Sequence, residues 1–310
     1  MTEIQTRWGD KRYHSLDYEL KKRFGTKVYK LSLDGGMTCP NRDGKLDTRG
    51  CIFCSAGGSG DFATSRKHSI TEQIASAKAL IATKQKDGGK YIAYFQAFTN
   101  TYESVSYLRT IFYEAILQPE VVALSIATRP DCLDSEILDL LKELNSIKPV
   151  WVELGLQTIH ESTAQFIRRG YSLPIFNQAV NELNKIGIET IVHVIIGLPN
   201  ETKEDLLKTI EHIANLPIQG IKLQLLHILK GTDLAKYIDE IHILSLEEYL
   251  DYLVDCIEHL PTDIVIHRIT GDGPKSLLLA PLWSSNKKYV LNSIQKKLKE
   301  NDSWQGKALS

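Results

Sequence analysis

Three cysteines in the first part of the chain have types and spacing that could do chemistry. Cys39, Cys51 and Cys54 are separated by eleven and by two residues, whereas Cys132 and Cys256 stand alone. In a reducing compartment, a tight group of three cysteines more often binds a metal than forms disulfides. Several glycines between residues 44 and 60 allow the backbone to fold tightly around a bulky inorganic group.

Two kinds of inorganic group compete for these cysteines. Structural zinc normally has four protein ligands, and His68, at an unusual spacing, is the nearest residue that would complete a set. An iron–sulfur cluster held by three cysteines leaves one iron open to a substrate or cofactor, which is a chemical reason to stop at three. We therefore favour a [4Fe-4S] cluster and keep a zinc-binding interaction module as an alternative. Cys132 and Cys256 are interpreted as small core residues.

The cysteine group follows the first of six predicted strands, which alternate with predicted helices. Hydrophobic patterns predict strands at residues 28–33, 91–98, 121–127, 150–156, 189–196 and 220–226. They predict helices near residues 71–86, 104–117, 135–145, 161–167, 174–186 and 203–214. Such alternation favours an α/β fold with a parallel sheet, either doubly wound or curled into a full or partial barrel. Residues 246–310 add helices near 246–259 and 287–300 and a short strand at 264–269.

Polar residues follow each predicted strand. Ligands of such sheets lie at the carboxyl ends of the strands, so one mouth would collect these groups together with the cysteine loop. The groups in question are Thr99-Asn100-Thr101, Arg129, Gln157, Gly197-Leu-Pro and Lys230-Gly231-Thr232.

Composition excludes several classes of protein. Hydrophobic residues make up 43% and charged residues 24%, which is typical of a folded globular chain rather than a disordered or low-complexity one. No apolar run approaches the roughly eighteen residues that cross a bilayer, and the first ten residues lack the apolar segment of a signal peptide. We therefore expect a cytoplasmic protein without a membrane partner.

Both ends of the chain are basic, although the net charge is −1. Residues 1–30 hold eight Lys and Arg against four Asp and Glu, and residues 286–310 hold six against two. Either end could contact phosphate. Neither is a dense basic run, so a solvated amphipathic surface explains them as well.

The residues around the cysteines resemble the radical S-adenosylmethionine (SAM) superfamily. Over nearly its whole length the chain is similar to the stand-alone Elp3-like branch, of the YhcC/YtqA (MnmL) type. The first gap between its cysteines is longer than the commonest C-x3-C-x2-C spacing, as this branch shows. The most specific stretches are Lys11-Arg-Tyr-His-Ser-Leu, Lys30-Leu-Ser-Leu-Asp-Gly-Gly-Met-Thr-Cys-Pro-Asn-Arg-Asp-Gly and Gly50-Cys-Ile-Phe-Cys54.

The resemblance implies a fold and two cofactors. Residues 28–245 would form a partial (β/α)6 barrel, with a basic N-terminal extension at 1–27 and a C-terminal extension at 246–310 packed on it. A [4Fe-4S] cluster would be bound by Cys39, Cys51 and Cys54, with SAM on the open iron. An electron from a reductant such as flavodoxin or ferredoxin would cleave SAM, and the resulting 5'-deoxyadenosyl radical would abstract a substrate hydrogen. No second cluster is expected.

Three residues match positions where relatives contact the adenine or the amino group of SAM. Phe53 matches an aromatic residue near the adenine, although a plain packing role is as good an interpretation. Thr99 ends the segment where a Gly-Gly-Glu type strand end binds the methionine amino group, mostly through its backbone; that motif is absent here. Gly197, within Ile195-Ile-Gly-Leu-Pro199, matches the fifth-strand motif that packs against adenine.

Three further residues match positions near the ribose and the methionine carboxylate. Gln157 matches a glutamine that meets the ribose. Arg169 matches an arginine that pairs with the carboxylate, with Arg168 as an adjacent competitor. His193 stands where some relatives place a ribose-binding aspartate, and a core histidine is an equal interpretation.

The resemblance also suggests the substrate. It points to modification of the wobble uridine, U34, of tRNA, through conversion of 5-carboxymethylaminomethyl to 5-aminomethyl. A radical SAM enzyme acting on a small molecule such as a porphyrinogen is the alternative within the same superfamily. Candidate substrate-facing residues, each also open to interpretation as surface or core, are Arg66, Lys67, His68, Tyr102, His267, Arg268 and Asp272.

Overall fold

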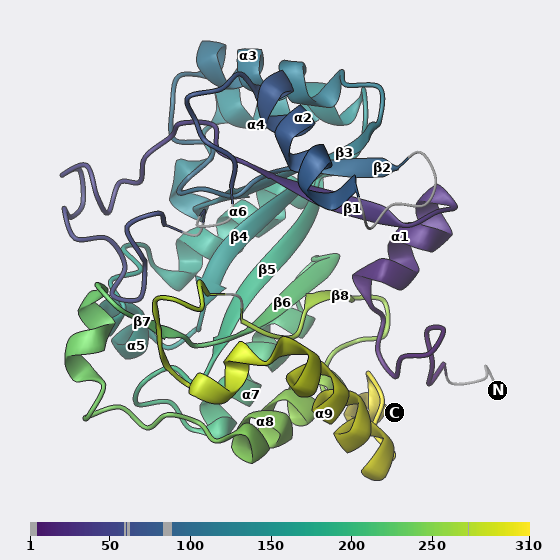
Figure 1. Ribbon diagram of the computed structural model, residues 1–310, viewed down its shortest axis with the longest axis vertical. Coiled ribbons are helices and arrows are strands. Elements are labelled where there is room, and N and C mark those ends of the chain that lie inside the picture. Colours follow the sequence, from purple (N-terminus) through teal and green to yellow (C-terminus); the bar gives the residue numbers. More distant parts are fainter. Residues whose placement is uncertain (1–4, 59, 61–62, 83–88, 272) are drawn as a thin grey trace.

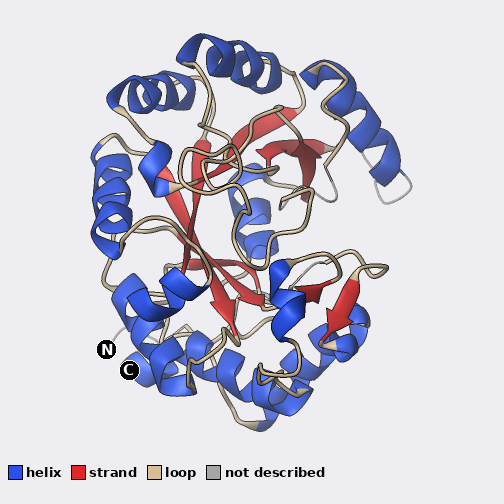
Figure 2. Cartoon of the chain, turned by 90° about the vertical axis from the view of Figure 1, so that its left-hand side faces the viewer, coloured by secondary structure: helices blue, strands red, loops and turns tan. Residues whose placement is uncertain are grey.

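A curled, wholly parallel sheet with helices around its outside dominates the fold (Figures 1 and 2). The computed structural model describes all residues except 1–4, 59, 61–62, 83–88 and 272. Within them the sheet has seven strands in the order β1-β2-β3-β4-β5-β6-β8. The strand order follows the chain, which curls the sheet into an open barrel rather than a doubly wound layer. The expected partial barrel is confirmed.

The strands are rich in apolar residues, and their outward-facing side chains belong to the main hydrophobic core beneath the helices. The barrel strands are β1 (Val28–Leu33), β2 (Lys90–Phe95), β3 (Val121–Thr128), β4 (Val150–Gln157), β5 (Glu189–Ile196), β6 (Gly220–Leu225) and β8 (Val265–Arg268). A separate antiparallel pair joins β7 (Ile228–Leu229) to β9 (Leu278–Ala280). The second strand ends earlier than the predicted residue 98, and Phe98 has a left-handed φ of 59°. The seventh barrel strand, β8, comes from the segment predicted as an extension and pairs with β6.

The helices have clear sequence origins. They are α1 (Leu16–Phe24), α2 (Ile70–Ile81), α3 (Val105–Ile116), α4 (Ser135–Asn145), α5 (Glu161–Phe166), α6 (Leu173–Lys185), α7 (Lys203–Ala214), α8 (Leu246–Glu258) and α9 (Lys287–Glu300). Reciprocal capping boxes begin α2, α7 and α8, each with a Ser or Thr cap and an acidic residue three positions on. The predicted end of α2 at residue 86 lies outside the described residues. Among those described, no helix is long and apolar enough to span a bilayer.

Inward-facing side chains form two layers across the interior of the barrel. The first is apolar and closes the amino end of the strands, with Leu20 of α1 packed on it. It consists of Val28, Ile92, Ala123, Trp151 and Ile191. Two residues further along the strands, where side chains again face inward, a polar layer follows. It consists of Lys30, Tyr94, Ser125, Glu153, His193 and Lys222.

The two basic chain ends lie together at the amino end of the barrel. Arg12 forms an ion pair of 2.7 Å with Asp302, and the backbone N–H of His14 donates to Gln305 Oε1 at 2.8 Å. Tyr18 and Lys22 of α1 line a cavity at this end together with Trp151 of the apolar layer. Both ends are therefore remote from the cysteine loop, which lies at the carboxyl end of the strands (Figure 1).

Candidate functional site

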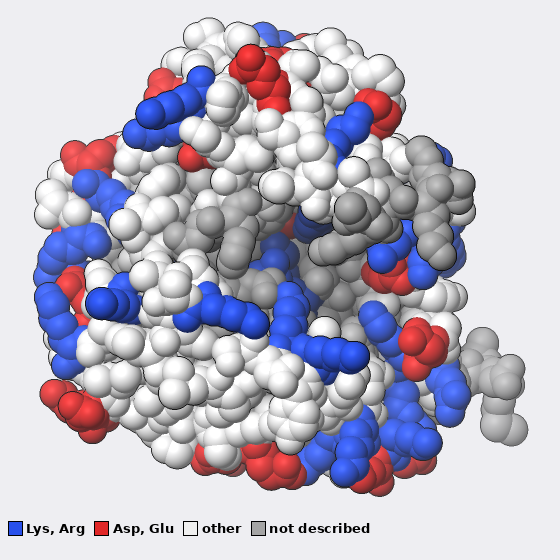
Figure 3. All heavy atoms as spheres, in the orientation of Figure 1, with Lys and Arg blue, Asp and Glu red and all other residues white. Residues whose placement is uncertain are grey.

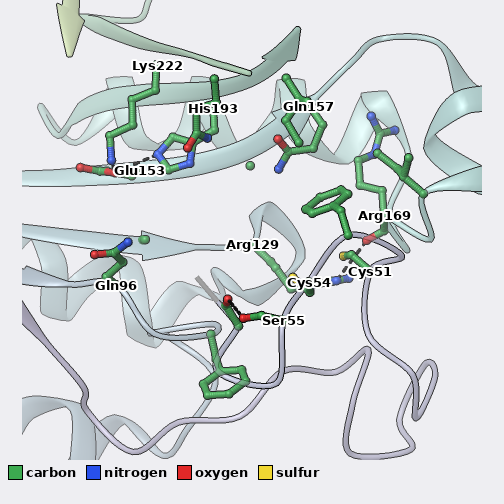
Figure 4. A pocket seen from close by; sticks show the side chains of 18 of the residues that line it. Cys51, Cys54, Ser55, Gln96, Arg129, Glu153, Gln157, Arg169, His193 and Lys222 are labelled. Carbon is green, nitrogen blue, oxygen red and sulfur yellow. Dashed lines mark hydrogen bonds and ion pairs between the residues drawn. The ribbon is translucent and has the colours of Figure 1, made fainter. Parts of the chain in front are cut away.

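A single cavity of about 270 Å³ connects the cysteine loop to the interior of the barrel. Cys39, Cys51 and Cys54 line its rim, and Glu153 and Lys222 of the polar layer line its floor. Figure 4 shows the labelled cysteines on one side and the floor residues on the other. Figure 3 shows the corresponding hollow in this face of the molecule. The mouth expected from the strand ends is present and includes Thr99, Arg129 and Gln157, but Gly197-Leu-Pro and Lys230-Gly231-Thr232 do not line it.

The cysteine loop is held by a buried asparagine. Asn41 is 1% exposed, and its amide nitrogen lies 2.7 Å from the carbonyl oxygen of Arg168 and 3.4 Å from Cys51 Sγ. The backbone oxygen of Asn41 accepts from Gly50 N–H at 2.6 Å. Gly50 has a φ of 77°, which favours glycine, and Cys54 N–H closes a turn onto Cys51 O at 3.0 Å. These bonds fix two of the three thiols against the β4–α6 connection.

The environment of these thiols favours a thiolate. The hydrogen bond with Cys54, followed by that of Asn41 and the charges of Arg129 and Arg42, lowers the pKa of Cys51 to about 6 despite its burial. The same partner and burial raise the pKa of Cys54, so the two thiols behave as a pair that has lost one proton. A thiolate is the form that binds metals.

The cysteines are not arranged around a single metal ion. In the described part of the chain, no three His, Cys, Asp or Glu residues form a group that could hold one ion. His68 is exposed and lies 3.7 Å from Glu72, and it does not line the cavity with the thiols. Thiols spread over a cavity rim suit a multi-iron cluster, in which each cysteine binds a different iron, better than closed tetrahedral zinc.

An apolar wall stands beside the thiols. Phe53 lines the cavity and packs on a small apolar cluster that includes Ile167, Ile195 and Leu226, which also line it. Such a wall can hold a planar base. Gly197 is not brought to this cavity. It borders a separate small pocket beyond β5, where a Cβ would lie 3.0 Å from Leu244.

Gln157 stands at the end of β4 in a strained conformation. Its φ is 69°, in the left-handed region that non-glycine residues avoid, and a register shift separates Gly155 and Gln157 in the pairing with β5. It lines the cavity, and its buried side-chain oxygen Oε1 has no partner among the described residues. A buried amide oxygen facing a cavity without a partner is a site for a ligand hydroxyl or amino group.

Arg169 lines the cavity, but its guanidinium is largely committed to the protein. Within the part of the chain that the structure describes, four of its five N–H donors make hydrogen bonds, which leaves one for a ligand carboxylate. The acceptors are Leu156 O, Thr158 O, Tyr171 O and Glu161 Oε1. The neighbouring Arg168 pairs with Asp233 at 2.6 Å. Thr99 also lines the cavity, and its backbone N–H already donates to Thr38 O at 3.2 Å.

The floor centres on Glu153, which is 1% exposed. Its carboxylate accepts hydrogen bonds from five strands: from Lys30 Nζ, Ser125 Oγ, Tyr94 OH, His193 Nε2 and Lys222 Nζ. Burial alone would raise the pKa of Glu153, but the charges of the two lysines reverse this and keep it well below its usual range. The carboxylate is therefore ionised at neutral pH.

Two of these partners have lowered pKa values. Burial and the charge of Lys222 lower the pKa of His193 to about 4, so its ring is neutral. With Nε2 donating to Glu153, its Nδ1 is an acceptor. Burial, opposed by Glu153 and assisted by Lys30 and Arg268, lowers the pKa of Lys222 to about 7. His193 is thus an element of the floor, held by a carboxylate rather than facing the rim.

Comparisons with known proteins decide the family. The model of the Radical SAM superfamily matches residues 48–213, and that of the Radical_SAM C-terminal domain matches residues 218–300. The chain belongs to the radical SAM superfamily. It is 48% identical over 300 residues to YtqA of Bacillus subtilis (strain 168), covering 96% of this chain and 93% of that protein. The stand-alone Elp3-like branch is thereby confirmed.

A second curated relative and a solved structure are more distant from this chain. The tRNA uridine(34) acetyltransferase of Methanocaldococcus jannaschii is 27% identical over 171 residues, 53% of this chain and 31% of that protein. The structure of Methanocaldococcus infernus Elp3 superposes with a TM-score of 0.69 at 16% identity, covering 90% of this chain and 64% of that one. The second likeness shows the shared fold.

Radical SAM enzymes use a [4Fe-4S] cluster and SAM, and the residues present here fit both. Three cysteines line one rim, one thiol of the pair is readily ionised, and the Asn41 amide lies at hydrogen-bond distance from Cys51 Sγ. Next to them lie the Phe53 wall and the unpartnered oxygen of Gln157. Thiolates, an apolar wall and a free amide oxygen are the donor set that a cluster and a nucleoside require.

The predicted substrate-facing residues divide between several places. Arg268 lines the radical SAM cavity, whereas His267 packs on Trp151 and lines the cavity at the amino end of the barrel. Arg66 and Lys67 are exposed before α2 and do not line the cavity. Tyr102 lies under Lys45, 5.2 Å from ring centre to Nζ. Asp272 lies outside the described residues.

Sequence reasoning missed the floor network and Asn41. Glu153 and Lys222 are the charged residues of β4 and β6, and each stands at an inward-facing position between apolar neighbours. A charge in the middle of a buried parallel strand must have a partner, and that is the signal that could have found them.

Proposed function

We propose that this radical SAM enzyme modifies the wobble uridine, U34, of tRNA and converts its 5-carboxymethylaminomethyl group to 5-aminomethyl. The observation that carries the proposal is the single cavity that joins the cofactor residues at the rim to a cationic floor. A substituent reaching down from the rim would meet Lys222 and Arg268 there. The likeness to a tRNA uridine(34) acetyltransferase supports tRNA as the substrate class.

The chain's own residues have separate tasks in this proposal. Cys39, Cys51 and Cys54 would hold the cluster, which together with SAM would supply hydrogen abstraction from carbon and act as the two-electron oxidant overall. Loss of a hydrogen atom from the methylene beside the carboxylate and of one further electron would leave an imine, and water would hydrolyse this imine to the 5-aminomethyl group and glyoxylate. Phe53 packs on the adenine, and Gln157 accepts from a ribose hydroxyl. Further contacts proposed from the family are the last free N–H of Arg169 to the methionine carboxylate and the backbone near Thr99 to its amino group. His193 contributes to the floor of the cavity, and Gly197 to the turn after β5.

Basic side chains around the mouth provide a path for RNA phosphates. Lys45, Arg49, Lys230 and Lys275 are exposed and belong to loops whose neighbouring residues line the cavity. Figure 3 shows Lys and Arg side chains along the edge of the hollow and inside it. Cations spaced along an opening suit a phosphate backbone with a base splayed into the cavity. The mouth, rather than the distant chain ends, is the surface that we propose for tRNA.

Anaerobic reconstitution with iron and sulfide tests the proposal directly. The loaded enzyme is reduced with dithionite or with flavodoxin or ferredoxin, and supplied with SAM and with tRNA that carries 5-carboxymethylaminomethyl at U34. We expect 5'-deoxyadenosine and, in nucleoside digests analysed by mass spectrometry, 5-aminomethyluridine. Both products should disappear in the Cys51→Ala variant. A digest that remains unchanged while SAM is cleaved would refute the tRNA reaction.

A parallel assay with a porphyrinogen distinguishes the tRNA reaction from the alternative reaction on a small molecule. Coproporphyrinogen III replaces tRNA under the same conditions, and its consumption in the absence of any change to tRNA would favour the small-molecule reaction. Zinc without iron after reconstitution would favour an interaction module.

A further inference from the structure

The ammonium group of Lys222 has one N–H that the protein does not use among the described residues. One N–H goes to Glu153 Oε2 and a second to Tyr94 OH at 3.0 Å. An ammonium has three donors, and Lys222 lines the cavity although it is only 3% exposed. Figure 4 shows it beside Glu153 and His193. The third donor is therefore available to a molecule in the cavity.

The floor carries more positive than negative charge. Among the described residues, Lys30 and Lys222 both pair with one carboxylate, that of Glu153, and the neighbouring His193 is neutral. Two ammonium groups on one buried carboxylate leave a net positive charge, which a further anion would balance. Burial is the largest cause of the lowered pKa of Lys222, Glu153 opposes it, and the charges of Lys30 and Arg268 add to it. A ligand carboxylate would complete the balance.

His193 supplies a complementary group next to Lys222. The two residues are direct partners in the register of β5 and β6, and adjacent strands lie about 4.8 Å apart. The Nδ1 atom of His193 is an acceptor because Nε2 donates to Glu153. The pair thus offers a cationic donor and a neutral acceptor side by side.

We propose that Lys222 binds a carboxylate of the substrate at the floor of the cavity and that His193 Nδ1 accepts a hydrogen bond from an adjacent N–H of the same substituent. The chemistry recognised is a secondary amine one methylene away from a carboxylate. The identification of this group with the carboxymethylaminomethyl substituent rests on the proposed function. The carboxylate contact itself does not, since the propionates of a porphyrinogen would also satisfy Lys222.

Lys30 is a matched control for Lys222. It binds the other oxygen of the same carboxylate at 2.9 Å, but it does not line the cavity and lies over the rings of Tyr94 and Trp151. Lys30→Met and Lys222→Met each remove one cation from Glu153. Only Lys222→Met removes a donor from the cavity.

The test compares binding of two nucleosides to the reconstituted enzyme with SAM, measured by calorimetry without reductant. The nucleosides are 5-carboxymethylaminomethyluridine and its carboxamide. We expect wild type and Lys30→Met to prefer the carboxylate. Lys222→Met should bind the carboxylate about tenfold to a hundredfold more weakly, as loss of a charge-assisted hydrogen bond predicts, with carboxamide and SAM affinity unchanged. Equal losses in both variants, or a loss of SAM affinity in Lys222→Met alone, would overturn the proposal.

A double variant and two further outcomes distinguish failure of the carboxylate site from failure of folding or of the proposed function. If Lys222→Met does not fold, Glu153→Gln combined with Lys222→Met removes both members of the buried pair, and the same loss of carboxylate preference is expected. Wild type could bind coproporphyrinogen III but not the nucleoside, with binding that requires Lys222. That result would support the carboxylate site and refute U34 of tRNA as the substrate. If tRNA is converted with an unchanged KM in Lys222→Met, the proposed function stands and the site is wrong.

Discussion

Asn41 donates from one amide group to both Cys51 Sγ, at 3.4 Å, and the carbonyl oxygen of Arg168, at 2.7 Å. This side chain connects Cys51, a proposed cluster ligand, to the connection between β4 and α6, which holds Arg169 and begins directly after Gln157, the last residue of β4. The geometry of the cluster loop and that of the SAM side of the cavity are therefore set together.

Replacing Asn41 by Ala should disturb the cluster more than the fold. N–H donors to sulfur stabilise the more negative, reduced state of a cluster. Because the variant lacks this donor, we expect a lower reduction potential and a faster loss of iron. Loss of the buried amide should cost about 1–3 kcal/mol of unfolding free energy. Potentiometric titration followed by electron paramagnetic resonance measures the first effect. Asn100→Ala is the control, because Asn100 binds two carbonyl oxygens but no cysteine; an equal shift in potential there would contradict the assignment.

Gln157 should affect SAM affinity and stability in opposite directions. Gln157→Gly removes the amide that faces the cavity and relieves a left-handed backbone at φ 69°. We expect SAM binding to weaken severalfold while the unfolding free energy stays level or rises by about 1 kcal/mol. Gln157→Ala should weaken SAM binding equally without the gain in stability. Equilibrium dialysis and anaerobic denaturation distinguish the two variants, and undiminished SAM binding in both would remove Gln157 from the site.

Glu153 should be among the most important residues for stability. Glu153→Gln leaves Lys30 and Lys222 buried without their carboxylate, which should cost about 3–5 kcal/mol. Anaerobic urea denaturation of the loaded protein measures this. Glu143→Gln is a matched exposed control, since Glu143 binds Arg109 and Tyr113 at the surface, and we expect little change in unfolding free energy there. Similar costs at both sites would show that the floor network is not the stabilising feature.

His193 should make the fold sensitive to mild acid. Its pKa of about 4 in the folded protein lies below the usual 6.5, so the unfolded chain takes up a proton first as the pH falls. The stability due to neutral His193 is complete above pH 6.5 and is lost between pH 6.5 and about 4, a change of about 3 kcal/mol. Nuclear magnetic resonance of labelled histidines, assigned with His193→Gln, follows the titration. A midpoint near 6.5 would contradict the burial of His193 beside the charge of Lys222, which lowers its pKa.

The sequence predicted the barrel well because its signals are local. Apolar runs of strand length, cap residues and glycines each act within a few positions, and the cysteine spacing lies within one loop. The position of β8 in the barrel was harder to predict. This strand has only four residues, and its place beside β6 depends on contacts between residues that are far apart in the sequence.

Side-chain directions at the site were not accessible from the sequence. The motif position of Arg169 identified a residue that lines the cavity, but the carbonyls that occupy its donors come from the folded loop. His193 lies on the predicted strand, but its partner Glu153 is 40 positions away. Gly197 is a turn residue that packs on Leu244, which no local pattern indicates.

The apolar layer formed by Val28, Ile92, Ala123, Trp151 and Ile191 lies between two cavities that open at opposite ends of the barrel. Its aliphatic side chains have no polar atoms. The layer therefore separates the cavity that holds the cysteines from solvent at the amino end of the barrel. Opening this layer would join the two cavities and admit water to the polar layer from the amino end. The residues that close the amino end of the barrel therefore also decide from which side water reaches Glu153.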